Sequence, residues 1–180
     1  NAATTNIVED FIGMIGLIRL PLVIFFIFSI FDYVFIEQGI QSWLPTFNNK
    51  VLFLPEAISI QITSIFALSI AVGRIVAGYA MKKLSWLYVI VGGLIGAAIL
   101  MVLILPMTRN IQPDSIHSWG EVPLAAFIFP MIGFFLAPIY PTLCSTVLSK
   151  LPKYRQSAMT GLIVIFSALG GTIGSRIVSI

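Results

Sequence analysis

The sequence predicts an all-α transmembrane fold, and its apolar pattern and its composition both support this prediction. Five apolar stretches are each about as long as a bilayer is thick: Pro21–Trp43, Ile58–Ala80, Trp86–Leu105, Pro123–Leu148 and Ala158–Ile180. A helix that crosses the hydrocarbon core needs about 20 mainly apolar residues. Only 9% of the residues are charged, compared with about 25% in ordinary soluble domains, so a soluble fold is excluded.

The basic residues indicate how the chain lies in the membrane. Two connectors collect them, and these residues are Lys82, Lys83, Lys150, Lys153 and Arg155. The 106–122 connector carries Arg109 alone among basic residues. Because cytoplasmic loops are enriched in Lys and Arg, we expect connectors 81–85 and 149–157 on the inside, and 44–57 and 106–122 on the outside.

Residues 1–19 are expected to form a cytoplasmic linker and an amphipathic approach to a membrane bundle at residues 20–180. The chain begins without the pattern of a signal peptide. Five spans leave the two ends of the bundle on opposite sides of the membrane. We therefore interpret the sequence as part of a longer protein.

The first span is the most polar one, since Asp32, Glu37 and two glutamines interrupt it. Trp43 suits the membrane interface, and Pro45 is expected to mark the exit from the span. The second span is expected to open at Pro55, in its first helical turn.

The third span contains no charged residue, and its three glycines give it one side for close packing. We expect it to be peripheral and to line no cavity. The fourth span contains Pro130, Pro138 and Pro141, which predict kinks. In the second and fifth spans, Ser69–Val76 and Gly171–Val178 resemble each other, which fits an inverted repeat that lacks its last helix.

Charges at membrane depth are the strongest functional signal, because each costs about 2.5–3.5 kcal/mol at a helix centre. Asp32 and Glu37 are five residues apart, so they lie on different faces of a helix. Tyr33, Glu37 and Gln41 share one face, which we interpret as the lining of a polar cavity. Asp32, Tyr33, Glu37 and Gln41 are therefore candidates for substrate binding or ion coupling. Alternatively, Glu37 and Gln41 are hydrated residues near the outer interface.

Arg74 lies near the inner end of the second span, before Lys82 and Lys83. These three residues are candidates for a gate in which Arg74 pairs with an acid in one conformation, and the alternative is that Arg74 snorkels to the interface. Tyr140 and Thr142 in the fourth span could bind a hydroxylated substrate, or they could make ordinary contacts between helices.

Neither a metal site nor a cofactor site is expected. Cys144 is the only cysteine and lies in an apolar stretch, and His117 is the only histidine, interpreted as a solvated loop residue. The net charge of +3 comes from the cytoplasmic flanks and indicates no nucleic-acid partner.

Several segments resemble the major facilitator superfamily, in particular its fucose-permease-like sugar transporters. Tyr33–Phe47 is similar to the family's seventh helix, and Gly73–Gly78 followed by Lys82 and Lys83 is similar to its Gly-Arg motif after the eighth. Segments similar to the tenth and eleventh helices are Phe135–Thr142, Gly161–Val164 and Ala168–Gly171. Asp32 has no counterpart in the pattern, so the resemblance assigns it no role.

The resemblance implies five helices of a six-helix half-bundle, namely helices seven to eleven of a twelve-helix transporter. We expect secondary active transport of a small hydrophilic solute, with a sugar favoured and a proton as coupling ion. The partners would be the lipid bilayer and a missing N-terminal half-bundle, in a bacterial inner membrane. The alternatives are a transporter of a non-sugar solute, a structural membrane subunit without transport activity, and, least supported, an intramembrane enzyme.

Overall fold

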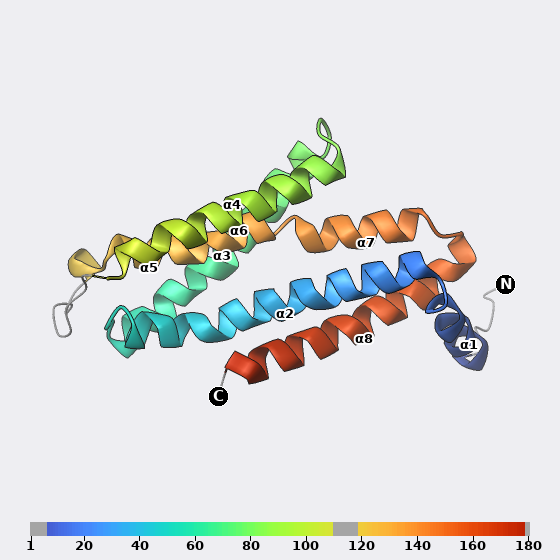
Figure 1. Cartoon of the computed structure of the whole chain (residues 1–180), viewed down its shortest axis with the longest axis horizontal. Coiled ribbons are helices and arrows are strands. Elements are labelled where there is room, and N and C mark those ends of the chain that lie inside the picture. The colour runs from blue at the N-terminus through green and yellow to red at the C-terminus, as the bar shows by residue number, and fades with distance from the viewer. Residues whose placement is uncertain (1–6, 110–118, 179–180) are drawn as a thin grey trace.

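The computed structural model describes residues 7–109 and 119–178, and every regular element within these ranges is helical (Figure 1). The elements are α1 (Ile7–Leu17), α2 (Pro21–Lys50), α3 (Glu56–Ala80), α4 (Trp86–Met107), η1 (Trp119–Glu121), α5 (Leu124–Ile128), η2 (Phe129–Met131), α6 (Ile132–Leu136), α7 (Ile139–Ser149) and α8 (Lys153–Val178). The predicted all-α class is confirmed. His117, which was interpreted as a loop residue, lies outside the described residues.

Five segments of the described chain are long and apolar enough to cross a membrane, which confirms the predicted spans. They are α2, α3, α4, the segment Leu124–Ser149 and α8. The prediction that the first span ends near Pro45 is wrong, because α2 continues through Pro45 to Lys50. Bonds from the next helix hold this end together, since the Ser59 hydroxyl donates to the Pro45 carbonyl at 2.8 Å. This contact ties the last turns of α2 to the first turn of α3.

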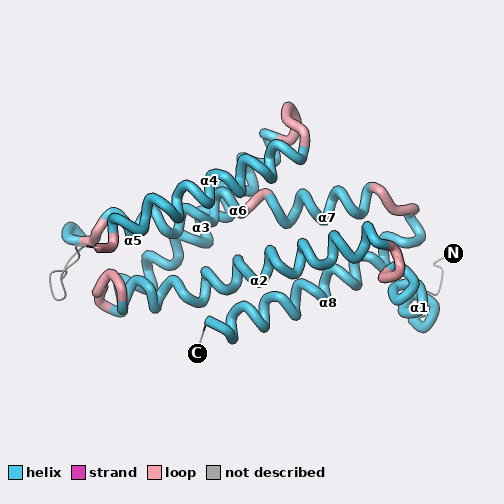
Figure 2. The backbone as a smooth tube through the Cα atoms, viewed as in Figure 1, coloured by secondary structure: helices cyan, strands magenta, loops and turns pink. Residues whose placement is uncertain are grey.

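The fourth span is broken at two of its three prolines, whereas Pro141 lies within α7. Pro130 lies within η2, and Pro138 lies between α6 and α7. Figure 2 shows the second break as a short loop segment between these two helices. Pro55 directly precedes α3, which begins at Glu56. It is therefore the N-cap residue of this helix and not a member of its first turn.

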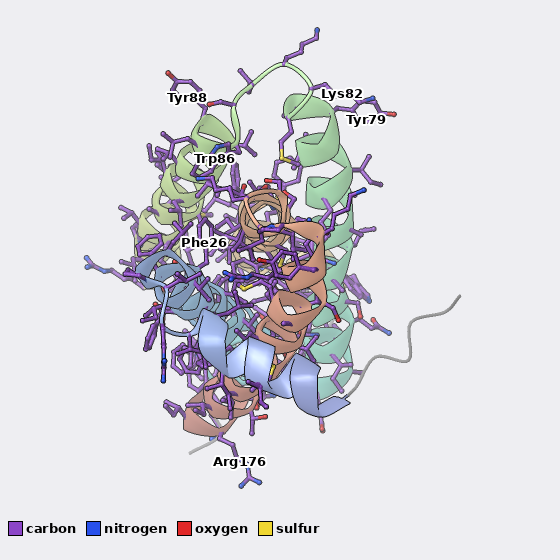
Figure 3. All side chains as sticks on the ribbon, turned by 90° about the vertical axis from the view of Figure 1, so that its right-hand side faces the viewer. Phe26, Tyr79, Lys82, Trp86, Tyr88 and Arg176 are labelled. Atoms are coloured by element: carbon purple, nitrogen blue, oxygen red, sulfur yellow. The ribbon has the colours of Figure 1, made fainter. Side chains whose placement is uncertain are left out.

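The connectors separate into two groups at opposite ends of the bundle. Figure 1 shows α1, the turn between α3 and α4, and the turn between α7 and α8 at one end, and the turn between α2 and α3 at the other. This agrees with the predicted grouping of connectors. Tyr79, Trp86 and Tyr88 are exposed around the α3–α4 turn (Figure 3). Exposed aromatic residues of this kind are typical of the membrane interface.

We expect the end that carries Lys83 and Lys153 to be cytoplasmic, because it collects the basic residues. In a Cys144→Ser background and sealed cells, an impermeant thiol reagent should miss Lys83→Cys and Lys153→Cys. The same reagent should label Lys50→Cys at the other end. Labelling of position 83 from outside, with position 50 protected, would reverse the topology.

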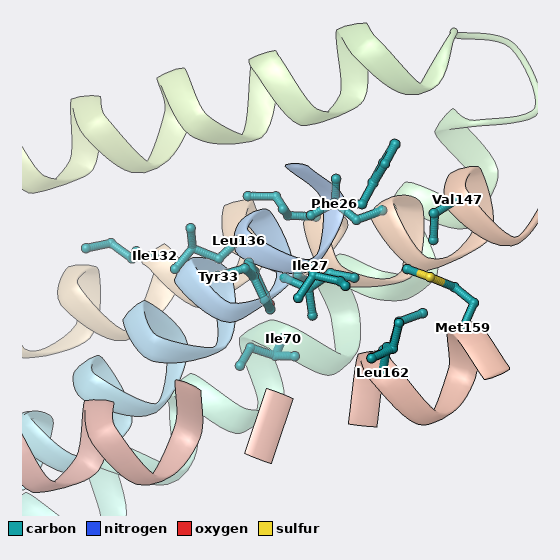
Figure 4. Close-up of a cluster of buried hydrophobic side chains, with 14 of the residues drawn as sticks. Phe26, Ile27, Tyr33, Ile70, Ile132, Leu136, Val147, Met159 and Leu162 are labelled. Atoms are coloured by element: carbon teal, nitrogen blue, oxygen red, sulfur yellow. The ribbon is translucent and has the colours of Figure 1, made fainter. Parts of the chain in front are cut away.

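Close helix contacts build the core. A Cβ atom on Gly170 or Gly174 of α8 would meet the carbonyl oxygen of Phe31 or Phe35 in α2, so these helices touch backbone to backbone. Gly73 of α3 is equally close to α6. Figure 4 shows the apolar side chains between these helices, including Phe26, Ile27, Leu136 and Leu162, all of them buried. The bundle is therefore a rigid frame for its few polar residues.

The third span, α4, is mostly exposed to the surroundings of the bundle, and of its residues Gly93 and Ile104 are buried. The prediction that it lines no cavity is wrong. It forms one wall of an apolar groove of about 420 Å³, which we call the α2–α4 groove. Its walls include Phe25, Asp32 and Ile36 from α2, and Trp86, Leu87 and Leu94 from α4. Because the groove is apolar, α4 can line it with apolar side chains and needs no polar partner there.

Candidate functional site

Asp32 and Tyr33, two neighbouring polar residues of α2, differ in burial. Tyr33 is buried and packs against α7, where its ring lies 5.9 Å from the ring of Tyr140. Asp32 is exposed and lines the α2–α4 groove. Tyr33 also lines this groove, so the groove reaches the helix face that carries Tyr33 and Glu37.

Glu37 lies near the middle of α2, about 24 Å along the helix from Pro21 and about 20 Å before Lys50. Its carboxylate Oε1 lies 3.9 Å from Nη2 of Arg74 in α3. The Glu37 side chain is 14% exposed and that of Arg74 is 50% exposed. The pair is thus open on one side, so that a solute or another charged group could separate its members.

Tyr33 lies one turn before Glu37. Its hydroxyl lies close enough to Glu37 and Arg74 to interact with both charges electrostatically. That hydroxyl is buried and finds no hydrogen-bond partner among the residues the structure describes. An unpartnered buried hydroxyl costs about 1–3 kcal/mol. It is therefore a donor available to Glu37, or to a ligand that reaches this position.

Tyr140 of α7 shares a hydrogen bond with Ser167 of α8, at 3.2 Å between the two hydroxyl oxygens. Both side chains are half-buried. Sequence reasoning missed Ser167, because α8 carries several hydroxyl residues and its pattern does not show which one faces inward. Thr172, for example, donates to the Ala168 carbonyl of its own helix at 2.8 Å.

Four membrane spans thus contribute to one group of polar side chains, which we call the polar cluster. It consists of Tyr33 and Glu37 from α2, Arg74 from α3, Tyr140 from α7 and Ser167 from α8. It offers hydroxyls, one carboxylate and one guanidinium. These groups can bind a polar solute by hydrogen bonds, and the carboxylate can accept and release a proton.

Three of the predicted binding residues lie outside the polar cluster, and one of them is Asp32 in the α2–α4 groove. Gln41 is exposed one turn beyond Glu37, and its side chain accepts a hydrogen bond from Gln38 at 3.5 Å. Thr142 is fully buried, and its hydroxyl donates to the sulfur of Met81 at 3.3 Å. In this structure Thr142 joins α7 to the end of α3.

Two of the three predicted gating residues are also separate from the cluster. Lys82 and Lys83 are exposed in the turn after α3, where the Lys82 ammonium lies 4.9 Å from the centre of the Tyr79 ring. Arg74 alone of the three meets an acid. Within residues 7–109 and 119–178, no group of three His, Cys, Asp or Glu side chains is arranged to hold a metal ion.

Comparison with known proteins gives one match. The family model described as Major Facilitator Superfamily matches residues 3–175, which is nearly the whole chain. No curated protein and no solved structure matches it.

Proposed function

Because this chain belongs to the Major Facilitator Superfamily and is an integral, multi-pass membrane transporter of that type, we propose that it moves a small hydrophilic solute by proton-coupled alternating access. A sugar is the favoured solute, and a bacterial inner membrane is the proposed location. The chain would supply helices seven to eleven, and a second half-bundle would close the site from the other side.

The polar cluster is the observation that carries this proposal. Polar side chains from α2, α3, α7 and α8 meet within a bundle whose surface and core are otherwise mainly apolar. Ionisable groups inside a membrane are costly and mark substrate or ion pathways. Hydroxyl, carboxylate and guanidinium groups together match the donors and acceptors of a sugar.

Glu37 would have two partners in the transport cycle. In the described conformation it pairs with Arg74, whose side chain remains half-exposed. Protonation of Glu37, or binding of a solute hydroxyl to it, would release Arg74. The release would then link proton or solute binding to the relative movement of the two half-bundles, with Arg74 as the gating residue.

A transport measurement with the complete protein tests the proposal. Purified protein in liposomes should take up a labelled solute from a panel of hexoses, pentoses, amino acids and organic acids. Accumulation of a sugar should increase when the outside is acidified relative to the lumen. Uptake of a non-sugar alone would overturn the sugar assignment, and uptake that ignores the proton gradient would overturn the coupling.

Tyr140→Phe is expected to weaken solute affinity and to lower the stability of the protein only slightly. The substitution keeps the ring that packs on Tyr33 and removes the hydroxyl that bonds Ser167. One hydrogen bond contributes about 0.5–1.5 kcal/mol, so KM should rise about 2- to 12-fold. Tyr88→Phe, at a 71% exposed position on α4, is the matched control and should leave KM unchanged. An unchanged KM in both variants would remove Tyr140 from the binding site.

A further inference from the structure

A pocket of about 520 Å³ lies between the α1 segment and the first turns of α8, and we call it the α1–α8 pocket. Figure 1 shows these segments at the end of the bundle that collects the basic connectors, which we expect to face the cytoplasm. The walls combine apolar side chains with one cation, and they include Leu17, Leu20, Tyr154, Arg155 and Ala158. None of the lining residues belongs to the polar cluster, so the pocket is separate from the proposed transport site.

Arg155 is the cation of the pocket, and its side chain is exposed. Its guanidinium carbon lies 5.4 Å from the centre of the Tyr154 ring, which is a cation–π distance. Among the residues that the structure describes, no carboxylate forms an ion pair with it. A planar guanidinium binds a carboxylate or a phosphate through two parallel hydrogen bonds. Arg155 therefore gives the pocket a place for an anionic group.

The helix α1, which forms one wall, is apolar on two opposite faces. One face carries Met14 and Leu17, and it packs on the bundle, since Leu17 is 2% exposed and the Met14 sulfur lies against Gly161 of α8. The other face carries Ile12 and Ile15, which are 63% and 49% exposed. A helix with such an outward apolar face suits the boundary between the headgroups and the acyl chains of a bilayer.

The position of the pocket along α8 agrees with that depth. Gly161, where α1 crosses α8, lies about 12 Å along the helix from Lys153. Arg155 lies in the first turn of α8, on the side of the crossing that leads to the exposed basic turn. The cation is therefore at the level of the headgroups, and the apolar walls lead from it toward the acyl chains.

These features together select one kind of ligand. Basic pockets at the cytoplasmic surface of a membrane attract the anionic headgroups of the inner leaflet. A soluble phosphate ester would satisfy Arg155 equally well, but it would leave the apolar wall at Leu20 in water. A lipid satisfies both parts of the pocket.

We propose that the α1–α8 pocket binds an anionic phospholipid of the inner leaflet. Its phosphate pairs with Arg155, and one of its acyl chains lies along Leu17 and Leu20. The outward isoleucines of α1 enter the same leaflet beside it.

Quenching by spin-labelled lipids tests this site in the complete protein. In a Cys144→Ser background, a fluorophore on Ile12→Cys lies beside the pocket but outside its lining. Phosphatidylcholine liposomes carry a small fraction of either phosphatidylglycerol or phosphatidylcholine with a nitroxide near the top of one acyl chain. Labelled phosphatidylglycerol should quench the fluorophore several-fold more effectively than labelled phosphatidylcholine.

Variants of Arg155 show whether the preference arises in the pocket. Arg155→Gln should lower the preference for phosphatidylglycerol at position 12 about fivefold, whereas Arg155→Lys should keep part of it. Lys82→Gln is the matched control, because Lys82 also lies against a tyrosine ring at this end of the bundle, 4.9 Å from the centre of Tyr79, but outside the pocket. It should leave the preference at position 12 unchanged.

A second reporter separates the pocket from the general attraction of lipid to basic residues. Tyr88→Cys is 71% exposed near the start of α4 and carries the same fluorophore. Any preference for phosphatidylglycerol at this position should be the same with and without Arg155→Gln. A response to Arg155→Gln at both positions would mean that Arg155 acts on the surface potential and holds no lipid, which would overturn the proposal.

Four further results would contradict the lipid site. Equal quenching by the two lipids at position 12 would mean that the bilayer covers the pocket without selecting a headgroup. Absence of quenching by either lipid would mean that another part of the protein covers it. A preference that millimolar sn-glycerol 3-phosphate abolishes would assign the pocket to a soluble phosphate ester. Loss of the preference in both Arg155 variants, with a lowered melting temperature, would make Arg155 a structural residue.

Discussion

Glu37→Gln is expected to abolish uphill accumulation of the solute while solute exchange across the membrane persists. The substitution keeps the shape of the side chain and its hydrogen-bonding oxygen but removes the negative charge and the exchangeable proton. If Glu37 couples transport to protons, net accumulation should fall at least tenfold. Counterflow exchange, which needs no net proton movement, should continue with a KM raised by no more than about tenfold.

Glu56→Gln is the matched control, since Glu56 is exposed at the start of α3. It should leave both accumulation and exchange unchanged. Wild-type accumulation in Glu37→Gln at normal expression would mean that Glu37 is a hydrated acid with no part in coupling. Loss of exchange together with accumulation, in a variant that still folds, would assign Glu37 to an obligatory step of solute movement.

The spans were predictable because membrane insertion depends on local composition. A run of about 20 apolar residues satisfies the bilayer whatever its neighbours are, so α3 and α4 were predicted with nearly the correct bounds. The end of α2 was not, because it depends on a partner. Ser59 and Asn48, on different helices, help to keep α2 regular beyond Pro45.

The candidate site was predictable only where one helix determines it. The spacing of Asp32 and Glu37 places these two acids on different faces of α2 in any helical fold. Tyr33, between them in position, both lines the α2–α4 groove and packs on Tyr140. The inclusion of Ser167 and the burial of Thr142 depend on how α7 packs against α8 and α3. No pattern within one segment contains that information, since it is fixed by contacts between segments.

Glycine positions show the same distinction within a single motif. The sequence places Gly73 and Gly78 in the second span, but it does not separate their environments. The structure does. A Cβ atom on Gly73 would fall within 3.0 Å of Phe134 in α6 and of Ala137, the residue after α6, whereas a Cβ on Gly78 would meet nothing within 4 Å.

Gly73→Ala is therefore expected to be destabilising and Gly78→Ala neutral to slightly stabilising. The added methyl group at position 73 would collide with a backbone carbonyl, that of Phe134. A side-chain rotation cannot remove this collision, so α3 must move away from α6. Such overpacking costs about 1–3 kcal/mol, which should lower the melting temperature in detergent by several degrees. Intrinsic helix propensity favours alanine over glycine by about 1 kcal/mol at both positions, so the difference between the two variants isolates the packing term.

Gly73→Ala should also impair transport, because Gly73 directly precedes Arg74. The move of α3 away from α6 would change the reach of the Arg74 guanidinium toward Glu37, which is already 3.9 Å away. Uptake per folded molecule should therefore fall in Gly73→Ala and remain normal in Gly78→Ala. Equal melting temperatures in the two variants would contradict the close contact between α3 and α6. A lower melting temperature with normal uptake per folded molecule would separate this packing from the position of Arg74.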